Sequence, residues 1–189
     1  MSRDTVIYDA CVLYPAPLRD LLMELATTGL YRARWTSQIH QEWTRNVQQN
    51  RPDVSPAQLE RTVDLMNRAV MDCLVSGYED LIDGLDLPDR DDRHILAAAI
   101  RSRANAIVTF NLDDFPSRIL SKYDVEAQHR DEFLHHQFGL DQAQIIMAAQ
   151  KIRKRLKNPP KTAEEYLDIL EAQRLPHFVA ALRPYAKVI

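Results

Sequence analysis

The sequence has little glycine, little cysteine and no long hydrophobic run, and each scarcity narrows the class of protein. Four glycines among 189 residues are few for an all-β fold, whose tight turns depend on glycine, so we expect a helix-rich fold. Two cysteines, Cys11 and Cys73, form neither a disulfide framework nor a metal-ligand spacing, which favours a reducing, cytoplasmic location. No apolar run approaches the roughly 18 residues of a membrane span. The stretch Met1–Thr5 leads directly into a strand-like run, so we expect no signal peptide.

Charge of one sign is not in excess either. The chain has 24 Lys and Arg against 27 Asp and Glu, for a formal net charge of −3. This balance argues against a protein that coats nucleic acid non-specifically, but it allows nucleic acid to be handled at a local, metal-bearing site. A hydrophobic fraction of 46% and a charged fraction of 27% are typical of a folded globular protein.

Short apolar runs alternate with helical patterns in the first two thirds of the chain. Three runs predict strands: Thr5–Tyr8, Tyr31–Trp35 and Ala106–Phe110. The helical patterns are the leucine repeat Leu18–Leu25, the stretch after the cap Thr36–Ser37, the helix opened by the capping box Ser55–Gln58, and the run Ile95–Ile100. Strands separated by helices predict right-handed crossovers and a mainly parallel sheet, hence the α/β class.

Beyond residue 125 the patterns are helical alone. Asp141 can cap one helix, Thr162–Glu165 is a second capping box, and a last helix follows Pro176. We therefore expect an α/β domain over 1–125 and a helical extension over 126–189.

Acidic and amide side chains follow the predicted strands, and others begin or line the helices between them. The candidates are Asp9, Glu42, Asp92 and a further donor from Asn111, Asp113 or Asp114. Because the carboxyl ends of neighbouring parallel strands meet at one edge of a sheet, these groups can gather there. Clustered carboxylates repel unless a cation joins them, and oxygen ligands without Cys or His suit Mg²⁺ or Mn²⁺. Such a site is typical of phosphodiester hydrolysis, in which water rather than the ribose 2′-OH is the nucleophile.

Four motifs, taken in order, resemble the PIN-domain ribonucleases, particularly VapC-type toxins with a long C-terminal region. They are Val6–Asp9, Glu42, Asp92–Ala99 and Val108–Phe115, of which the last two are the most specific. The resemblance covers roughly residues 3–125. It departs from the family at Cys11, where a small polar residue is frequent, and at Asn111, where an acid sometimes stands.

The resemblance implies a three-layer PIN fold, with a central mainly parallel sheet flanked by helices. It also implies Mg²⁺- or Mn²⁺-dependent cleavage of single-stranded or loop RNA, inhibition by a cognate antitoxin protein, and frequent homodimers. By position, Asp9, Glu42, Asp92 and Asp114 match the catalytic acids, and Asp9, Asp92 and Asp114 the metal ligands.

Other side chains are candidates for supporting roles. Thr109 and Asn111 can hydrogen-bond the ligating carboxylates. Candidate contacts to RNA phosphates are Arg19, Arg45, Arg93, Lys151 and Arg155. The last two belong to the basic run Lys151–Lys161, which can equally be a solvated helix face.

Three functional hypotheses remain open at this point. The first is a metal-dependent endoribonuclease acting as a toxin, which leaves 5′-phosphate and 3′-hydroxyl ends. The second is a PIN-like binding module without turnover, and the third is a housekeeping PIN nuclease. Two of the acids also have a purely structural interpretation. Glu42 can form an ion pair with Arg45 one turn away, and Asp92 can cap the helix after it.

Overall fold

The computed structural model describes residues 4–189, so the first three residues of the N-terminal stretch, part of the signal-peptide expectation, lie outside it. The chain forms two compact units. One contains the chain up to Tyr14 together with Tyr31–His129, and the other contains Pro15–Leu30 together with Arg130–Ile189. No helix among the described residues has both the length and the hydrophobicity to cross a membrane.

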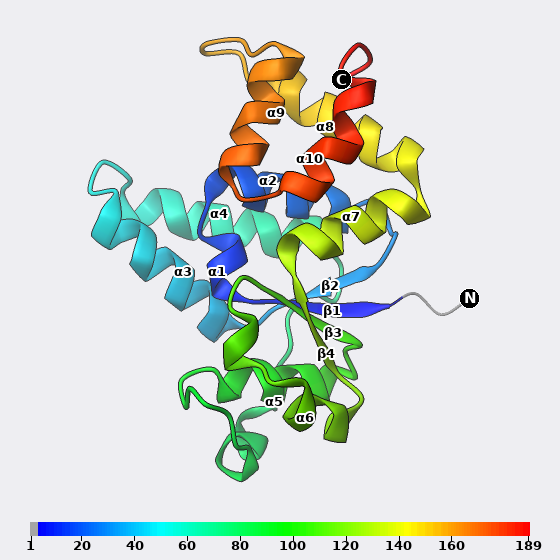
Figure 1. The fold of residues 1–189 in the computed structure, drawn as a ribbon. Coiled ribbons are helices and arrows are strands. Elements are labelled where there is room, and N and C mark those ends of the chain that lie inside the picture. Colours follow the sequence, from blue (N-terminus) through cyan, green and yellow to red (C-terminus); the bar gives the residue numbers. More distant parts are fainter. Residues whose placement is uncertain (1–3) are drawn as a thin grey trace. The chain divides into compact units, whose positions relative to one another are not determined.

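A four-stranded, all-parallel sheet is the centre of the first unit (Figure 1). Its order is β2-β1-β3-β4, with the strands β1 (Thr5–Tyr8), β2 (Arg32–Arg34), β3 (Ala106–Thr109) and β4 (Glu126–His129). Tyr8 lies opposite Val108, so β1 and β3 end side by side. The predicted α/β class with a mainly parallel sheet is confirmed.

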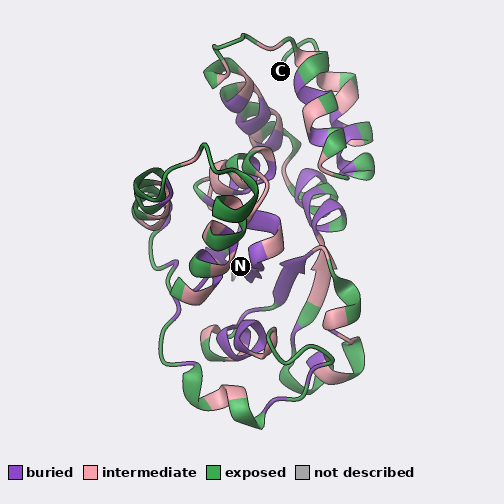
Figure 2. Cartoon of the chain, turned by 90° about the vertical axis from the view of Figure 1, so that its left-hand side faces the viewer, coloured by how far each residue is buried: buried purple, intermediate pink, exposed green. Residues whose placement is uncertain are grey.

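The strand β4 is a correction to the expected helical start of the C-terminal region. Residues 126–129 pair with the whole of β3 rather than forming a helix. Their sequence, Glu-Ala-Gln-His, contains no β-branched residue and only one apolar one, because β4 is an edge strand whose side chains are half-buried or exposed. Figure 2 shows this contrast with the fully buried β1 and β3.

Helices and short 3₁₀ turns connect the strands of the first unit. They are α1 (Ala10–Leu13), α3 (Ser37–Asn50), α4 (Pro56–Ala69), η1 (Glu79–Gly84), α5 (Arg93–Ser102), η2 (Leu112–Asp114), α6 (Ser117–Leu120) and η3 (Ser121–Tyr123). The predicted caps are present: the Thr36 hydroxyl accepts a hydrogen bond from the Ile39 amide at 3.0 Å, and Ser55 and Gln58 form the capping box of α4. The α5 residues Ala97–Ala99 are fully buried, and α5 packs against β1 and β3.

The second unit is entirely helical. It contains α2 (Ala16–Ala26), α7 (Arg130–Leu140), α8 (Gln142–Arg155), α9 (Ala163–Ala172), α10 (Pro176–Leu182) and η4 (Arg183–Tyr185). The leucine repeat predicted the helix α2 correctly, and its four leucines, Leu18, Leu21, Leu22 and Leu25, are fully buried. Because α2 packs with α8 and α9, residues from both ends of the sequence share one hydrophobic core.

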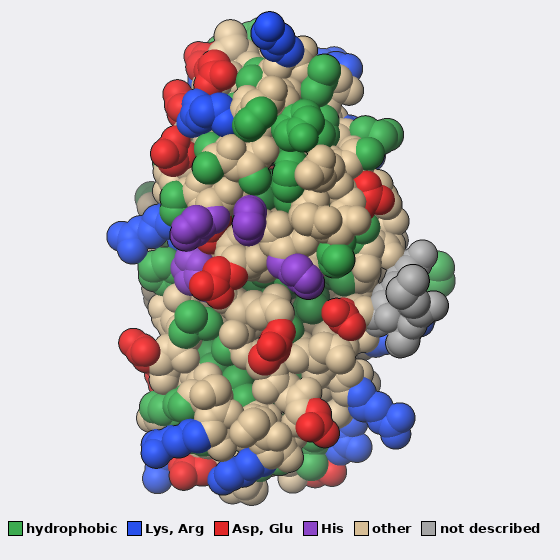
Figure 3. Space-filling view, turned by 45° about the vertical axis from the view of Figure 1, so that its right-hand side comes forward, with side chains coloured by type: hydrophobic (Ala, Val, Ile, Leu, Met, Phe, Trp, Pro, Cys, Tyr) green, Lys and Arg blue, Asp and Glu red, His purple; other side chains and the backbone are tan. Residues whose placement is uncertain are grey.

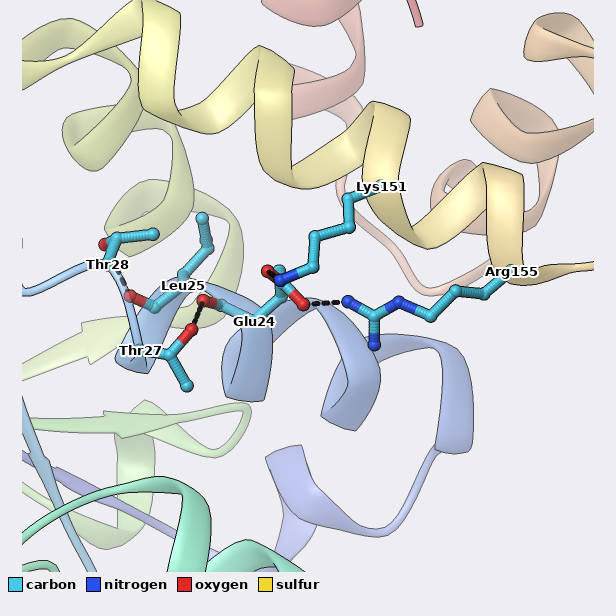
Figure 4. A network of polar contacts seen from close by, with 6 residues as sticks. All are labelled: Glu24, Leu25, Thr27, Thr28, Lys151 and Arg155. Carbon is cyan, nitrogen blue, oxygen red and sulfur yellow. Dashed lines mark hydrogen bonds and ion pairs between the residues drawn. The ribbon is translucent and has the colours of Figure 1, made fainter.

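An ion-pair network joins α2 to α8 (Figure 4). The Glu24 carboxylate, 10% exposed, accepts from Lys151 Nζ at 2.7 Å and also binds the Arg155 guanidinium. Burial alone would raise the pKa of Glu24, but the hydrogen bonds and charges of these two cations outweigh it and lower the pKa. Two cations of the predicted basic run, Lys151 and Arg155, therefore form ion pairs within this unit.

Candidate active site

The carboxyl ends of β1 and β3 bring the first acid next to the polar residues that follow β3. Asp9 comes directly after β1, and its amide donates to the Val108 carbonyl at 3.1 Å. Thr109 is the last residue of β3, and Asn111 follows two residues later. Parallel pairing thus places residues about a hundred positions apart at one edge of the sheet.

The Asp9 carboxylate is buried and held by several donors. Its Oδ2 accepts from the Thr109 hydroxyl at 2.6 Å and from the Cys11 thiol at 2.9 Å, while Oδ1 accepts from the Cys11 amide at 3.4 Å. The Cys11 sulfur in turn accepts from the Phe110 amide at 3.2 Å. Burial, followed by the charge and hydrogen bond of Asp9, raises the pKa of the Cys11 thiol, so the thiol stays protonated and donates.

Asp92 occupies the N-cap position of α5 but makes no capping hydrogen bond, which leaves its carboxylate available. Burial raises the pKa of Asp92 to about 7, with further contributions from the negative charges of Asp9, Asp114 and Asp89. His94 acts in the opposite direction. Asp92 therefore lies within the electrostatic reach of the first and fourth candidate acids, and negative charge at this edge is incompletely balanced.

Glu42 projects from α3 toward the same region. Its Oε1 lies 2.9 Å from His94 Nε2 and accepts from Gln38 Nε2 at 3.3 Å. Within residues 4–189 no ion pair joins Glu42 to Arg45. The interpretation of Glu42 as half of a surface ion pair on one helix is therefore wrong.

Asp114 and Asp113 differ in their surroundings. Asp114 is half-buried and acts electrostatically on Asp92, whereas Asp113 is exposed and has no such effect on Asp92. Asn111 lies at the cavity described below, and its amide donates to the Thr109 hydroxyl at 3.1 Å.

A cavity of about 860 Å³ unites most of these groups within the first unit. Its lining includes Asp9, Cys11, Gln38, Glu42, Arg45, Tyr78, Arg90, Asp92, His94 and Asn111. Three of the four candidate acids thus face one space. Asp114 lies outside this lining and is connected to the cavity through its effect on Asp92.

The candidate RNA-binding cations are distributed between the two units. Arg45 lines the cavity, and the Arg93 guanidinium lies 3.5 Å from Asp86. Arg19, Lys151 and Arg155 belong to the helical unit, where burial lowers the pKa of Arg19 and the other two bind Glu24. On the face shown in Figure 3, blue and red side chains are interspersed rather than gathered by sign.

The oxygen donors fit a hard divalent cation in their chemistry. Burial is the largest cause of the raised pKa of Asp92, and repulsion from neighbouring carboxylates, which a bound cation would relieve, adds to it. Across residues 4–189, no three or more His, Cys, Asp or Glu side chains are already arranged around a common metal position. The hydrogen bonds of Asp9 Oδ2 to Thr109 and Cys11 leave Oδ1 as its less engaged oxygen.

Sequence reasoning missed His94 and the donor role of Cys11. A histidine two residues after Asp92, at the start of a helix of small apolar residues, was a usable signal for the first. Cys11 was noted only as a departure, because sequence does not reveal where a thiol hydrogen bond points.

A parallel α/β fold with an acid-lined cavity at the carboxyl edge of its sheet defines the class of this protein. The model of the family described as "PIN domain" matches residues 4–113, and the one described as "VapC50 C-terminal domain" matches residues 130–184. The chain therefore belongs to the PIN-domain family, and its C-terminal region matches that of VapC50.

A curated protein of Mycobacterium tuberculosis (strain ATCC 25618 / H37Rv) with the name "Putative ribonuclease VapC50" is 38% identical over 107 residues. The match covers 57% of this chain and 62% of that relative. No solved structure matches the chain.

Proposed function

We propose that the chain is a divalent-metal-dependent endoribonuclease that acts as the toxin of a type II toxin–antitoxin pair. The observation that carries the proposal is the cavity at the carboxyl edge of the PIN sheet, which Asp9, Glu42 and Asp92 line together. The ribonuclease name of the 38% identical relative supports the choice of RNA as substrate.

In this proposal Asp9, Asp92 and Asp114 hold Mg²⁺ or Mn²⁺, and Glu42 completes the catalytic acids. When bound there, a divalent ion would supply Lewis acidity to lower the pKa of water and to balance charge on the leaving oxygen of a phosphodiester. Thr109 fixes Asp9 through its 2.6 Å hydrogen bond, and Asn111 supports Thr109 through its backbone amide. Water is the nucleophile, so the products carry 5′-phosphate and 3′-hydroxyl ends.

We assign the nearest contacts with RNA phosphates to Arg45, which lines the cavity, and to Arg93, which follows Asp92. Lys151 and Arg155 already bind Glu24, and together with Arg19 they are assigned to more distant RNA backbone.

The VapC50 likeness supports a cognate antitoxin and a cytoplasmic location, and we extend the proposal to a homodimer. The proposal keeps a nuclease domain and a helical extension, expected over 1–125 and 126–189, but Glu126–His129 completes the sheet of the first and Pro15–Leu30 belongs with the helices of the second.

The test is induced expression of the chain and of its Asp9→Asn and Asp92→Asn variants, followed by mapping of new RNA 5′ ends. We expect new 5′-phosphorylated ends with the parent and none with either variant. Asp64→Asn is the matched control, because Asp64 is exposed and pairs only with Arg68 on its own helix.

Purified protein separates this function from its two rivals. If Asp9→Asn cuts RNA as fast as the parent, or EDTA leaves the rate unchanged, the proposal is wrong. A binding module without turnover would bind no Mn²⁺ at millimolar concentration in calorimetry. A housekeeping nuclease would cleave RNA but would not arrest growth on induction.

A further inference from the structure

His94 is a buried titratable group beside the acid-lined cavity to which the proposed reaction gives no role. It is the second residue of α5, only 3% of its side chain is exposed, and it lies at the cavity. The six residues that follow it in α5, Ile95–Ile100, are apolar, so a buried imidazole at this position is expected to have a polar partner.

Glu42 is the acceptor within reach of this imidazole. The distance from His94 Nε2 to Glu42 Oε1 is 2.9 Å, which is hydrogen-bond length, but the ring and carboxylate are not aligned for a good hydrogen bond. Within residues 4–189, neither ring nitrogen of His94 has an aligned partner. Because the terminal torsions of His and Glu have broad minima, a small rotation of either side chain brings the Nε2 proton onto the carboxylate.

Glu42 needs such a partner to stay at the cavity. It stands on a helix, 24% exposed, and its other contact is the amide of Gln38 at 3.3 Å, one turn earlier on the same helix. Gln38 therefore cannot fix Glu42 relative to the other acids. His94 can, because it belongs to α5, the helix that begins immediately after Asp92.

We propose that His94 is a positioning residue, which donates from Nε2 to Glu42 and thereby fixes the second acid relative to Asp92 in the cavity. This inference rests on the proposed metal-dependent nuclease function. The required tautomer carries its proton on Nε2 and leaves Nδ1 bare. His94 lines the same cavity as Glu42 and Asp92 and stands two residues after Asp92, so the ring is near both acids. Carboxylates at metal sites are commonly held in orientation by hydrogen bonds from neighbouring side chains.

The test compares His94→Leu, which removes the donor, with His94→Gln, whose amide can donate from a similar position. Glu42 is not one of the three proposed ligands, but its negative charge at the cavity favours a bound cation. We therefore expect His94→Leu, which frees Glu42 to turn away, to weaken Mn²⁺ binding in calorimetry by about 10-fold, and His94→Gln to retain most of the affinity. In a Glu42→Gln background, His94→Leu should add almost nothing, because its partner carboxylate is already gone. His136→Leu, at an exposed histidine of α7, is the matched control.

A purely structural role predicts a different pattern. Both His94 variants would then lower the melting temperature in EDTA, and the effects of His94→Leu on Mn²⁺ binding would be the same with and without Glu42. Either equal Mn²⁺ affinity of His94→Leu and parent, or additivity with Glu42→Gln, overturns the inference. Cleavage of RNA by the parent alongside such a result leaves the proposed function standing and removes only the role of His94.

Imidazole NMR of the metal-free parent keeps the inference testable if His94→Leu does not fold. We expect the ¹⁵N shifts to show His94 protonated on Nε2, with a change on Glu42→Gln and none on Asp64→Asn. Protonation on Nδ1 alone, or insensitivity to Glu42→Gln, overturns the assignment whether or not the protein cleaves RNA.

Discussion

At the scale of single residues, the orientation of Asp9 depends on a hydroxyl from another strand. The Thr109 hydroxyl donates to Asp9 Oδ2 at 2.6 Å, and both side chains are buried. Thr109→Val keeps the shape but leaves the carboxylate one donor short. We expect a loss of about 1–3 kcal/mol in the free energy of unfolding and of about 10–100-fold in cleavage rate.

Urea unfolding and a fluorogenic RNA assay measure these two losses. Thr62→Val is the control, because the Thr62 hydroxyl donates only to the Gln58 carbonyl of its own helix. Parental activity in Thr109→Val would show that Thr109 does not orient Asp9 for the reaction.

The pKa of Asp92 leads to a pH dependence of stability in the metal-free protein. Burial and the charges of Asp9, Asp114 and Asp89 raise it to about 7, against about 4 in the unfolded chain. The folded state therefore binds more protons than the unfolded state between these values, so stability falls as pH rises from about 4 to about 7. After discounting for solvent, the loss should be about 1–2 kcal/mol.

Thermal melts in EDTA from pH 4.5 to 8 measure this effect. Asp92→Asn should flatten the decline and match or exceed the stability of the parent at pH 8, because it removes like-charge repulsion. A parent whose stability does not fall across this range would show that Asp92 is ionised normally.

The candidate acids could be predicted from the sequence, whereas the side chains that hydrogen-bond to them could be predicted only in part. Asp9 and Asp92 were predictable because one ends a strand and the other begins a helix, and element ends can be inferred from hydrophobic patterns. The choice of Asp114 over Asp113 depends on the turn η2, and the contacts of Cys11 and His94 depend on rotamers. None of these leaves a periodic pattern in the sequence.

At the scale of elements, α5 controls the site because it begins beside Asp92 and packs closely on the sheet. The fully buried residues Ala97–Ala99 allow this approach to β1 and β3. Ala98→Leu should cost about 1–3 kcal/mol by overpacking, and it should also lower activity by moving the start of the helix. Ala57→Leu, at an exposed position of α4, should change stability by less than about 0.5 kcal/mol.

Chemical denaturation of both alanine variants is the measurement. An Ala98→Leu protein as stable and active as the parent would mean that the helix can shift without cost. The small-residue run predicted this close packing, whereas β4 escaped prediction because an edge strand can be polar.

At the scale of the whole molecule, the helical unit is built from two separated parts of the sequence. The buried leucine face of α2 packs with α8 and α9, and Glu24 binds Lys151 and Arg155 across the same pair of helices. The helix α2 was predictable from its leucine spacing, but its partners were not, because they lie more than a hundred residues away. A cut between an N-terminal and a C-terminal domain therefore divides one hydrophobic core.

Truncation after His129 keeps the whole sheet and removes α7–α10. Four buried leucines of α2 then lose their partners, so we expect aggregation or strong binding of the dye ANS, which reports exposed apolar surface. Replacing Leu18, Leu21, Leu22 and Leu25 by polar residues in the truncated chain should restore solubility. A truncated chain that is monomeric, binds no ANS and melts cooperatively would show instead that residues 1–129 fold independently, because α2 would then need no C-terminal partner.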